Sequence, residues 1–170
     1  MKIERLELFG YKRLMLANIQ HFIYTPSSAY QLILGTNGSG KSSILYELTP
    51  LPAHSSNYTK DGYKDVTITH RGVEYRLISN FKTGKHSFVK DGEELNPGGT
   101  AQVQKEHVKR EFNLTAELHE VLIGQARFTE MSPSDRRKWI TMLSTCDYSY
   151  ALGVHKKLAS AARDQQGALR

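Results

Sequence analysis

Over much of residues 3–89, hydrophobic and polar side chains alternate with a period of two, which is typical of strands with one buried face. Strands are predicted at Ile3–Phe9, Ala17–Tyr24, Val66–His70, Val73–Phe81 and Ser87–Val89. Only Arg71-Gly72 separates the third from the fourth, so we expect these two to form a hairpin. Residues 53–64 are polar and lack a period, and they are predicted to form a long surface loop.

After Pro97-Gly98-Gly99 the period lengthens to about 3.6 residues, which predicts helices in the rest of the chain. They are expected from about Ala101, over Glu117–Ile123, from Ser132-Pro133 to Leu143 with Trp139 on the buried side, and over 148–170. In the third helix the serine should act as N-cap and the proline should occupy the first position. The last helix has an apolar stripe too narrow to pack on a core, so it is predicted to enter a coiled coil.

A glycine-rich segment carries the clearest chemistry. The short apolar run Tyr30–Leu34 is predicted to be a buried parallel strand, and it leads into the spacing glycine, four residues, glycine-lysine-serine at residues 35–42, before a helix over Ile44–Leu48. Glycines let successive backbone N–H groups point at phosphates, and a helix N-terminus favours the same anion. Lys41 would reach the β- and γ-phosphates of a nucleotide, and the Ser42 hydroxyl would bind Mg²⁺.

Composition narrows the class of protein further. The 170 residues are 39% hydrophobic and 24% charged, which is enough for a buried core. A net charge of +6 favours polyanionic partners such as nucleotides or nucleic acid. The single cysteine, Cys146, excludes an internal disulfide and a four-cysteine zinc site. No apolar run is long enough to cross a bilayer and no signal-peptide core is present, so we expect no membrane partner.

Basic residues of the middle region have two interpretations. They either form a track for DNA phosphates or are an ordinary solvated surface. The residues concerned are Lys60, Lys64, Arg71, Lys82, Lys85, His86, Lys105, Lys109 and Arg110.

The glycine-rich segment is longer than the minimal pattern and carries a family resemblance. Asn37-Gly38-Ser39-Gly40-Lys41-Ser42-Ser43-Ile44-Leu45 resembles the loop of ATPases of the structural-maintenance-of-chromosomes (SMC) type, within the ABC superfamily. Three other segments are similar in order and pattern: Ile3-Glu4-Arg5-Leu6 with Gly10-Tyr11-Lys12, the block Val66–Val89, and Ile123-Gly124-Gln125 with Phe128–Arg137. The first two resemble the opening strand with its basic turn and the antiparallel block of the same ATPases. The last resembles the segment after the Q-loop in SbcC-like ATPase subunits of double-strand-break nucleases and of phage recombination exonucleases.

The resemblance implies an α/β fold: a P-loop ABC-type N-terminal lobe with a mixed sheet, an antiparallel block, and a C-terminal helix that starts a coiled coil. Residues 1–146 would be the ATP-binding lobe, with the phosphate loop at 35–42 and a Q-loop region at 119–130. Residues 147–170 would begin the coiled coil. Neither a signature motif nor an acidic strand end occurs, so these are expected in a C-terminal lobe beyond the coiled coil.

The implied cofactors are ATP and Mg²⁺. The residues implied to bind them are Lys12, Arg13, Gly35, Asn37, Gly38, Ser39, Gly40, Lys41, Ser42 and Ser43. Lys12 or its neighbour Arg13 would be the basic residue that the family places near the phosphates. Lys41 and Gln125 would be catalytic, and Ser42 and Gln125 would contact the metal. If the register slips by a few residues, His119 takes the place of Gln125. Tyr63 and Lys64, in the predicted surface loop, either close over the adenine, as the equivalent loop of the family does, or are ordinary surface residues.

The implied function is an ATPase that dimerises on ATP and regulates a nuclease in DNA double-strand-break processing; alone, this lobe would bind ATP but barely hydrolyse it. Implied partners are its own C-terminal lobe, a second head, a metallophosphoesterase-type nuclease and double-stranded DNA ends, in the cytoplasm or, in a eukaryote, the nucleus. The alternative is a chromosome-organising or RecF/RecN-like ATPase that tethers DNA without a nuclease. A P-loop kinase or GTPase would need an acidic strand end downstream, and a GTPase an Asn-Lys-x-Asp motif; neither is found.

Overall fold

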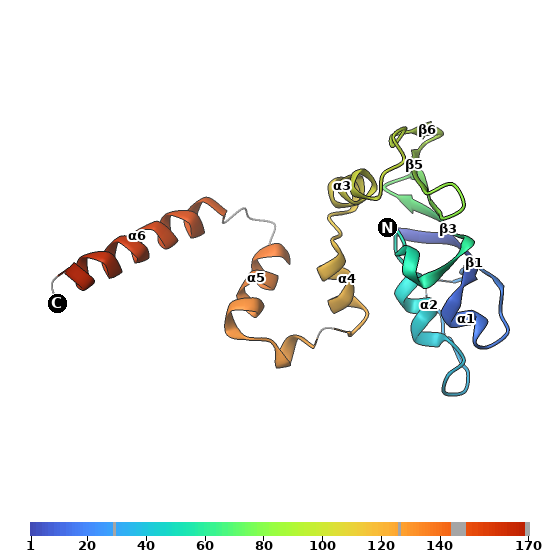
Figure 1. Cartoon of the computed structure of the whole chain (residues 1–170), viewed down its shortest axis with the longest axis horizontal. Coiled ribbons are helices and arrows are strands. Elements are labelled where there is room, and N and C mark those ends of the chain that lie inside the picture. The colour runs from blue at the N-terminus through green and yellow to red at the C-terminus, as the bar shows by residue number, and fades with distance from the viewer. Residues whose placement is uncertain (29, 126, 144–148, 169–170) are drawn as a thin grey trace. The chain divides into compact units, whose positions relative to one another are not determined.

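The computed structural model describes residues 1–28, 30–125, 127–143 and 149–168 (Figure 1). They divide into two compact units, residues 1–125 and 126–170. The first contains β1 (Lys2–Tyr11), α1 (Lys12–Met15), β2 (His21–Tyr24), α2 (Lys41–Glu47), a 3-10 helix (Ser55–Asn57), β3 (Tyr58–His70), β4 (Val73–Asn80), β5 (Lys85–Lys90), β6 (Glu93–Glu94), α3 (Ala101–Phe112) and α4 (Ala116–Leu122). The second contains a 3-10 helix (Phe128–Glu130), α5 (Pro133–Leu143) and α6 (Ser149–Ala168). The domain boundary predicted at 146/147 lies outside the described residues, as does Cys146.

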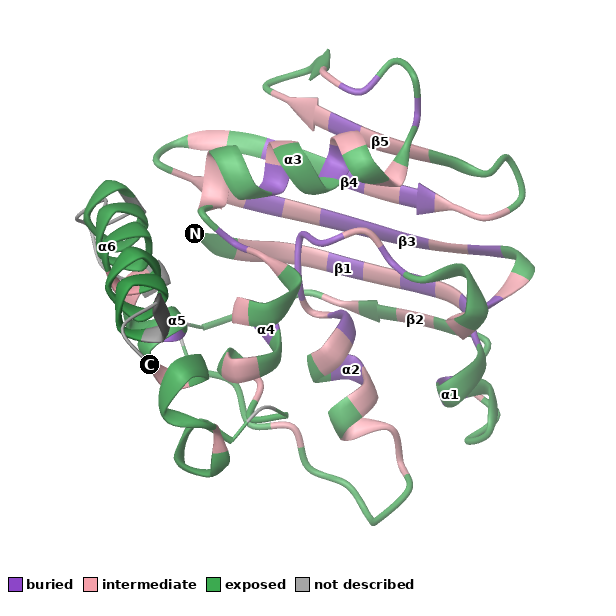
Figure 2. Ribbon diagram, turned by 60° about the vertical axis from the view of Figure 1, so that its left-hand side comes forward, coloured by how far each residue is buried: buried purple, intermediate pink, exposed green. Residues whose placement is uncertain are grey.

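A single six-stranded sheet with the order β2-β1-β3-β4-β5-β6 organises the first unit (Figure 2). Every neighbouring pair is antiparallel, so the expectation of a mixed sheet is wrong for the part of the chain that the structure describes. The predicted hairpin is confirmed: β3 and β4 pair with Val66 opposite Leu77. Its turn is Arg71-Gly72, and both residues have positive φ, as a tight hairpin requires.

The core follows the period of two along the strands. In β1, Leu6 and Leu8 are at most 1% exposed, because alternate side chains point to the same face of a strand. Val66, Leu77 and Phe88 from the next three strands join the same cluster. Helix α3 packs on β5, and its Val108 is fully buried in this cluster.

The predicted surface loop over residues 53–64 is wrong in its second half, which belongs to β3. Phe9 of β1 lies opposite Tyr63, and Tyr11 lies opposite Tyr58, with a register irregularity between the two pairs. Tyr58 and Lys64 are both 2% exposed. The backbone of this polar segment completes the hydrogen-bond ladder of a long neighbouring strand, and that pairing is not visible in the local pattern.

The predicted buried strand at residues 30–34 is also wrong. Residues 31–36 form no regular structure, and Tyr30, Leu32 and Leu34 are 92%, 81% and 80% exposed. A strand requires a partner for its backbone N–H and C=O groups. The edge of the described sheet next to β1 is taken by β2.

The predicted helices are confirmed in kind and place. Thr100 and Thr115 act as N-caps of α3 and α4, accepting hydrogen bonds from Val103 N and Leu118 N. At the start of α5, Ser132 Oγ accepts from Asp135 N at 3.1 Å, as an N-cap serine does. Trp139 is buried, as expected.

Helix α6 forms as predicted, and its entry into a coiled coil stays a prediction. Its large apolar side chains are mostly exposed, with Tyr150 83% and Leu158 66% accessible. Of the helices that the structure describes, none combines the length and the apolar character required to span a membrane.

Candidate functional site

The glycine-rich loop runs from Gly35 directly into α2, and two glycines set its shape. Gly38 and Gly40 have φ of +85° and +91°, a region that side chains with a Cβ rarely adopt. Gly40 also lies against Leu14 of α1: a Cβ at this position would be 2.6 Å from Leu14 Cδ2. Glycine is therefore required here both by the left-handed backbone and by the close approach of α1.

Lys41 is the first residue of α2, and its ammonium bridges the start of the loop. Its Nζ donates to Gly35 O and Thr36 O, each at 2.7 Å. Ser39 N also donates to Thr36 O, at 3.2 Å, so the loop is closed by three hydrogen bonds to two carbonyl groups. An ammonium has three donors, which leaves one for a ligand while both carbonyl contacts persist.

Beside this loop is a hollow of about 410 Å³. It is lined by Arg13, Leu16, Asn37, Gly38, Gly40, Lys41, Ser42 and Ser43. The structure thus brings together six of the predicted loop residues with Arg13, while Gly35 and Ser39 take part through the contacts above. Two cations and no carboxylate face the hollow, which suits an anion.

Lys12 and Arg13 were the two candidates for the basic residue near the phosphates, and the structure places Arg13 at this hollow. Lys12 lies on another side of α1, where its Nζ donates to Ser56 O at 2.8 Å and lines a separate cavity. Consecutive residues of a helix point about 100° apart, so only one of the pair can face the loop.

Gln125 and His119 are the two candidates for the Q-loop residue, and neither lines the hollow. Gln125 is exposed, and its backbone N–H donates to Glu120 O at 2.9 Å. His119 is 7% exposed and packs edge-on against Tyr46 with ring centroids 5.8 Å apart. Burial lowers the pKa of His119, nearby Lys64 lowers it further, and Glu47 opposes this change. The assignments of metal and water sensing to either residue stay predictions.

Tyr63 and Lys64 do not form a flexible cover for an adenine, because both are held in β3. The Tyr63 ring stacks on Phe9, and its hydroxyl donates to Glu7 at 2.6 Å. Lys64 points into the protein, where its Nζ lies 3.2 Å from Glu47 Oε2. Lys64 is consequently excluded from the predicted DNA track as well.

The sequence analysis did not single out two buried polar residues at α2, the helix that follows the loop. Tyr11 is 1% exposed, and its ring packs against Tyr58 with centroids 5.0 Å apart. Burial, with a smaller contribution from Glu47, raises the pKa of Tyr11 to about 12. Glu47 ends α2, six residues after Lys41, and is 2% exposed. The sequence contained no signal for this pair, because the burial of Tyr11 and Glu47 depends on segments far along the chain.

No preformed cluster of metal-binding side chains occurs in the part of the chain that the structure describes, where no three His, Cys, Asp or Glu residues converge. A magnesium ion at the loop would therefore be held by the Ser42 hydroxyl together with the phosphates of a nucleotide. That donor set suits Mg²⁺, which is usually bound through few protein oxygens and substrate phosphates.

Comparisons with known proteins show a likeness to solved structures. No protein-family model matches the chain, and no curated protein is similar to it. Among solved structures, the SMC head domain from Thermotoga maritima is similar with a TM-score of 0.43 and 17% sequence identity. The likeness covers 63% of this chain and 42% of the Thermotoga chain, so this chain spans less than half the length of that protein.

Proposed function

We propose that this chain is the ATP-binding N-terminal lobe of an SMC-like ABC ATPase, which closes as a dimer of heads on ATP and regulates a partner nuclease in the processing of DNA double-strand breaks. The observation that carries the proposal is the hollow beside the glycine-rich loop. Its lining combines the loop sequence with two cations, Lys41 and Arg13.

The residues of the hollow have complementary tasks toward a nucleoside triphosphate. Lys41 and Arg13 neutralise phosphate charge, and loop N–H groups add donors where Gly38 and Gly40 leave the backbone open. Asn37 contributes a side-chain amide near the γ-phosphate. Magnesium, when bound, offsets the remaining charge, and the Ser42 hydroxyl is its protein ligand.

The same lining explains why this lobe alone should hydrolyse ATP very slowly. None of its residues is a carboxylate that could orient an attacking water. Catalysis of phosphoryl transfer requires positioned groups on the attacking side as well as charge neutralisation. In the proposal those groups come from the C-terminal lobe and from the second head.

The exposed segment before the loop supports the need for a second part. Tyr30, Leu32 and Leu34 alternate along the chain, and each is at least 80% exposed. Large apolar side chains at strand spacing mark a surface that another element covers. We propose that a strand of the C-terminal lobe pairs with residues 30–34.

The nuclease partner, the DNA ends and the cytoplasmic or nuclear location rest on the resemblance of the loop and of residues 123–137, together with the net charge of +6. Co-purification of the chain's full-length form with a metallophosphoesterase-type nuclease distinguishes this function from a tethering ATPase that acts without one.

Calorimetric titration with ATP, in magnesium and in EDTA, tests the nucleotide site. Lys41→Ala should weaken ATP binding at least tenfold, because it removes a charged hydrogen bond to phosphate. Ser42→Ala should weaken binding in magnesium and leave binding in EDTA unchanged. Lys109→Ala, an exposed lysine of α3, is the matched control and should have no effect. Equal affinity of the Lys41 variant and the control would refute the proposal.

A further inference from the structure

A second cavity of the first unit lies apart from the glycine-rich loop. Its volume is about 610 Å³, within the range of sites for small organic ligands. It is lined by Lys12, Pro52, Ala53, His54, Ser55, Tyr58, Thr59, Lys60, Phe81, Gly84, His86, Ala101 and Lys105. None of these residues lines the hollow at the loop, so the two cavities have separate walls.

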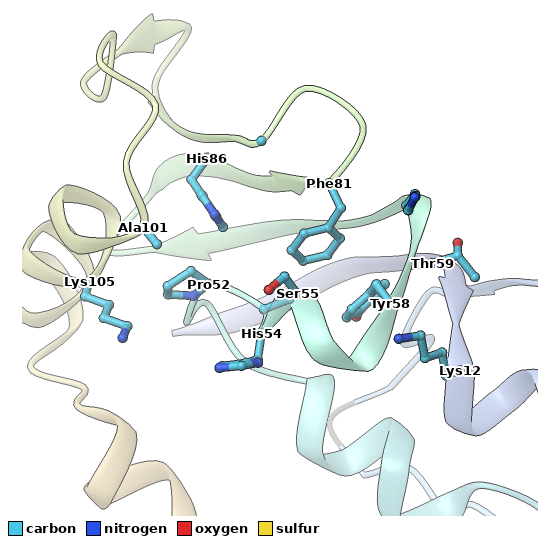
Figure 3. A pocket seen from close by; sticks show the side chains of 13 residues that line it. Lys12, Pro52, His54, Ser55, Tyr58, Thr59, Phe81, His86, Ala101 and Lys105 are labelled. Carbon is cyan, nitrogen blue, oxygen red and sulfur yellow. The ribbon is translucent and has the colours of Figure 1, made fainter.

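The charged side chains that line this cavity are all cationic. Lys12, Lys60 and Lys105 contribute ammonium groups, and no carboxylate is among the lining residues. Figure 3 shows Lys12 and Lys105 on opposite sides of the space. Lys60 and Lys105 are exposed and approach a ligand freely. Lys12 is already oriented by its hydrogen bond to Ser56 O.

Aromatic rings form the wall between the cations. Phe81 and Tyr58 pack with centroids 4.8 Å apart, and Phe81 contacts the His86 ring edge-on at 6.3 Å. Tyr58 is buried and supports the group, while Phe81 and His86 are half-buried and offer surface to the cavity (Figure 3). Ring faces of this kind stack flat bases irrespective of their identity.

A polar side chain completes the wall. His54 Nδ1 lies 2.7 Å from Ser56 Oγ, and the Ser56 backbone N–H donates to it at 3.3 Å. These contacts hold the exposed His54 ring beside the lysines, where it offers a further polar group to a phosphate or a base.

We propose that this cavity binds the end of a nucleic-acid strand, with a base against Phe81 and the adjoining phosphates on Lys12, Lys60 and Lys105. Three cations on separate elements match several phosphates better than one, and the rings match a base that is unstacked from its neighbours. The inference deepens the proposed function, on which the choice of a strand end rests: that function names DNA ends as partner without assigning residues.

The test is fluorescence anisotropy of a labelled single-stranded deoxythymidine decamer with the whole chain, over a range of salt concentrations. Three phosphate contacts predict that log affinity falls with log salt at a slope of about 2, since each contact on a single strand contributes about 0.7. Lys60→Ala and Lys105→Ala should each lower the slope by about 0.7. Lys2→Ala, at an exposed lysine of β1 that does not line the cavity, should not change it.

The aromatic contribution is tested separately. Phe81→Leu keeps an apolar side chain but removes the ring, and it should weaken decamer binding about tenfold with little change in salt slope. Urea unfolding of each variant separates lost binding from lost folding: a variant with the wild-type midpoint and wild-type affinity counts against the cavity. If the Phe81 variant unfolds early, the Lys60 and Lys105 variants, compared with the Lys2 control, decide alone.

Three further arms separate this proposal from the nucleotide site. ATP with magnesium should not displace the decamer, and Lys41→Ala should bind the decamer normally. Free thymidine monophosphate should bind at least tenfold more weakly than the decamer. Displacement by ATP, loss of decamer binding in the Lys41 variant, or equal binding of the mononucleotide would each overturn the proposal. Failure of ATP binding with intact decamer binding overturns only the proposed ATPase function.

Discussion

Lys64 offers the sharpest test of how the first unit is held together. It lies in β3 with 2% of its surface exposed, and its Nζ lies 3.2 Å from Glu47 Oε2 and donates to Leu51 O at 3.1 Å. Burial lowers the pKa of Lys64, and the Glu47 carboxylate opposes this change. A lysine is almost never fully buried without such a partner.

Replacing Lys64 with methionine keeps the apolar stem and removes the ammonium. The change leaves Glu47 as an unpaired buried carboxylate whose Oε1 already has no hydrogen-bond partner. Breaking a buried pair from one side costs about 3–5 kcal/mol, a large part of the 5–15 kcal/mol that stabilises a typical domain. The double variant Glu47→Leu/Lys64→Met leaves no unpaired charge. It should therefore be destabilised only by the loss of the hydrogen bond to Leu51 O, which costs about 1 kcal/mol.

Urea unfolding, followed by circular dichroism, measures these differences. Lys2→Met makes the same chemical change at a lysine whose side chain is 65% exposed, so its urea midpoint should equal that of the wild type. Trp139, the single tryptophan, reports residues 126–170 separately through its fluorescence. The reasoning is refuted if Lys64→Met unfolds at the same urea concentration as the Lys2→Met control, or if the double variant is no more stable than Lys64→Met.

Three other predictions concern single positions. Gly40→Ala forces a Cβ into a backbone with φ of +91° and against Leu14, so it should cost about 1–2 kcal/mol in urea unfolding and weaken ATP binding in a titration. A hydrogen bond from Lys90 is the main cause that holds the pKa of Glu111 at about 2, below its ordinary 4.5. The contribution of the Glu111 carboxylate to the free energy of unfolding is therefore complete above pH 4.5 and is lost as the pH falls toward 2. The urea midpoint of Glu111→Gln should lack this dependence on pH. Leu32→Ser should change the free energy of unfolding by less than about 0.5 kcal/mol, whereas loss of a buried leucine costs about 2–5 kcal/mol.

Features with a local cause were predictable from the sequence. The hairpin of β3 and β4 follows from alternation on both sides of a two-residue turn, and the helices follow from the change of period after residue 99. Helix starts at Ser132 and after the loop glycines depend on capping and backbone freedom within a few residues. The residues around the candidate site belong to this class, because their spacing is itself the signal.

Only the tertiary structure decided which segments pair and which side chains are buried. Residues 58–64 look like a loop but complete the ladder of β1, while residues 30–34 look like a core strand but have no partner in the described sheet. Lys12 and Arg13 are equivalent by sequence and are separated only by the direction in which α1 presents them. Backbone hydrogen bonds and burial depend on neighbours far along the chain, and a local pattern of polarity does not contain that information.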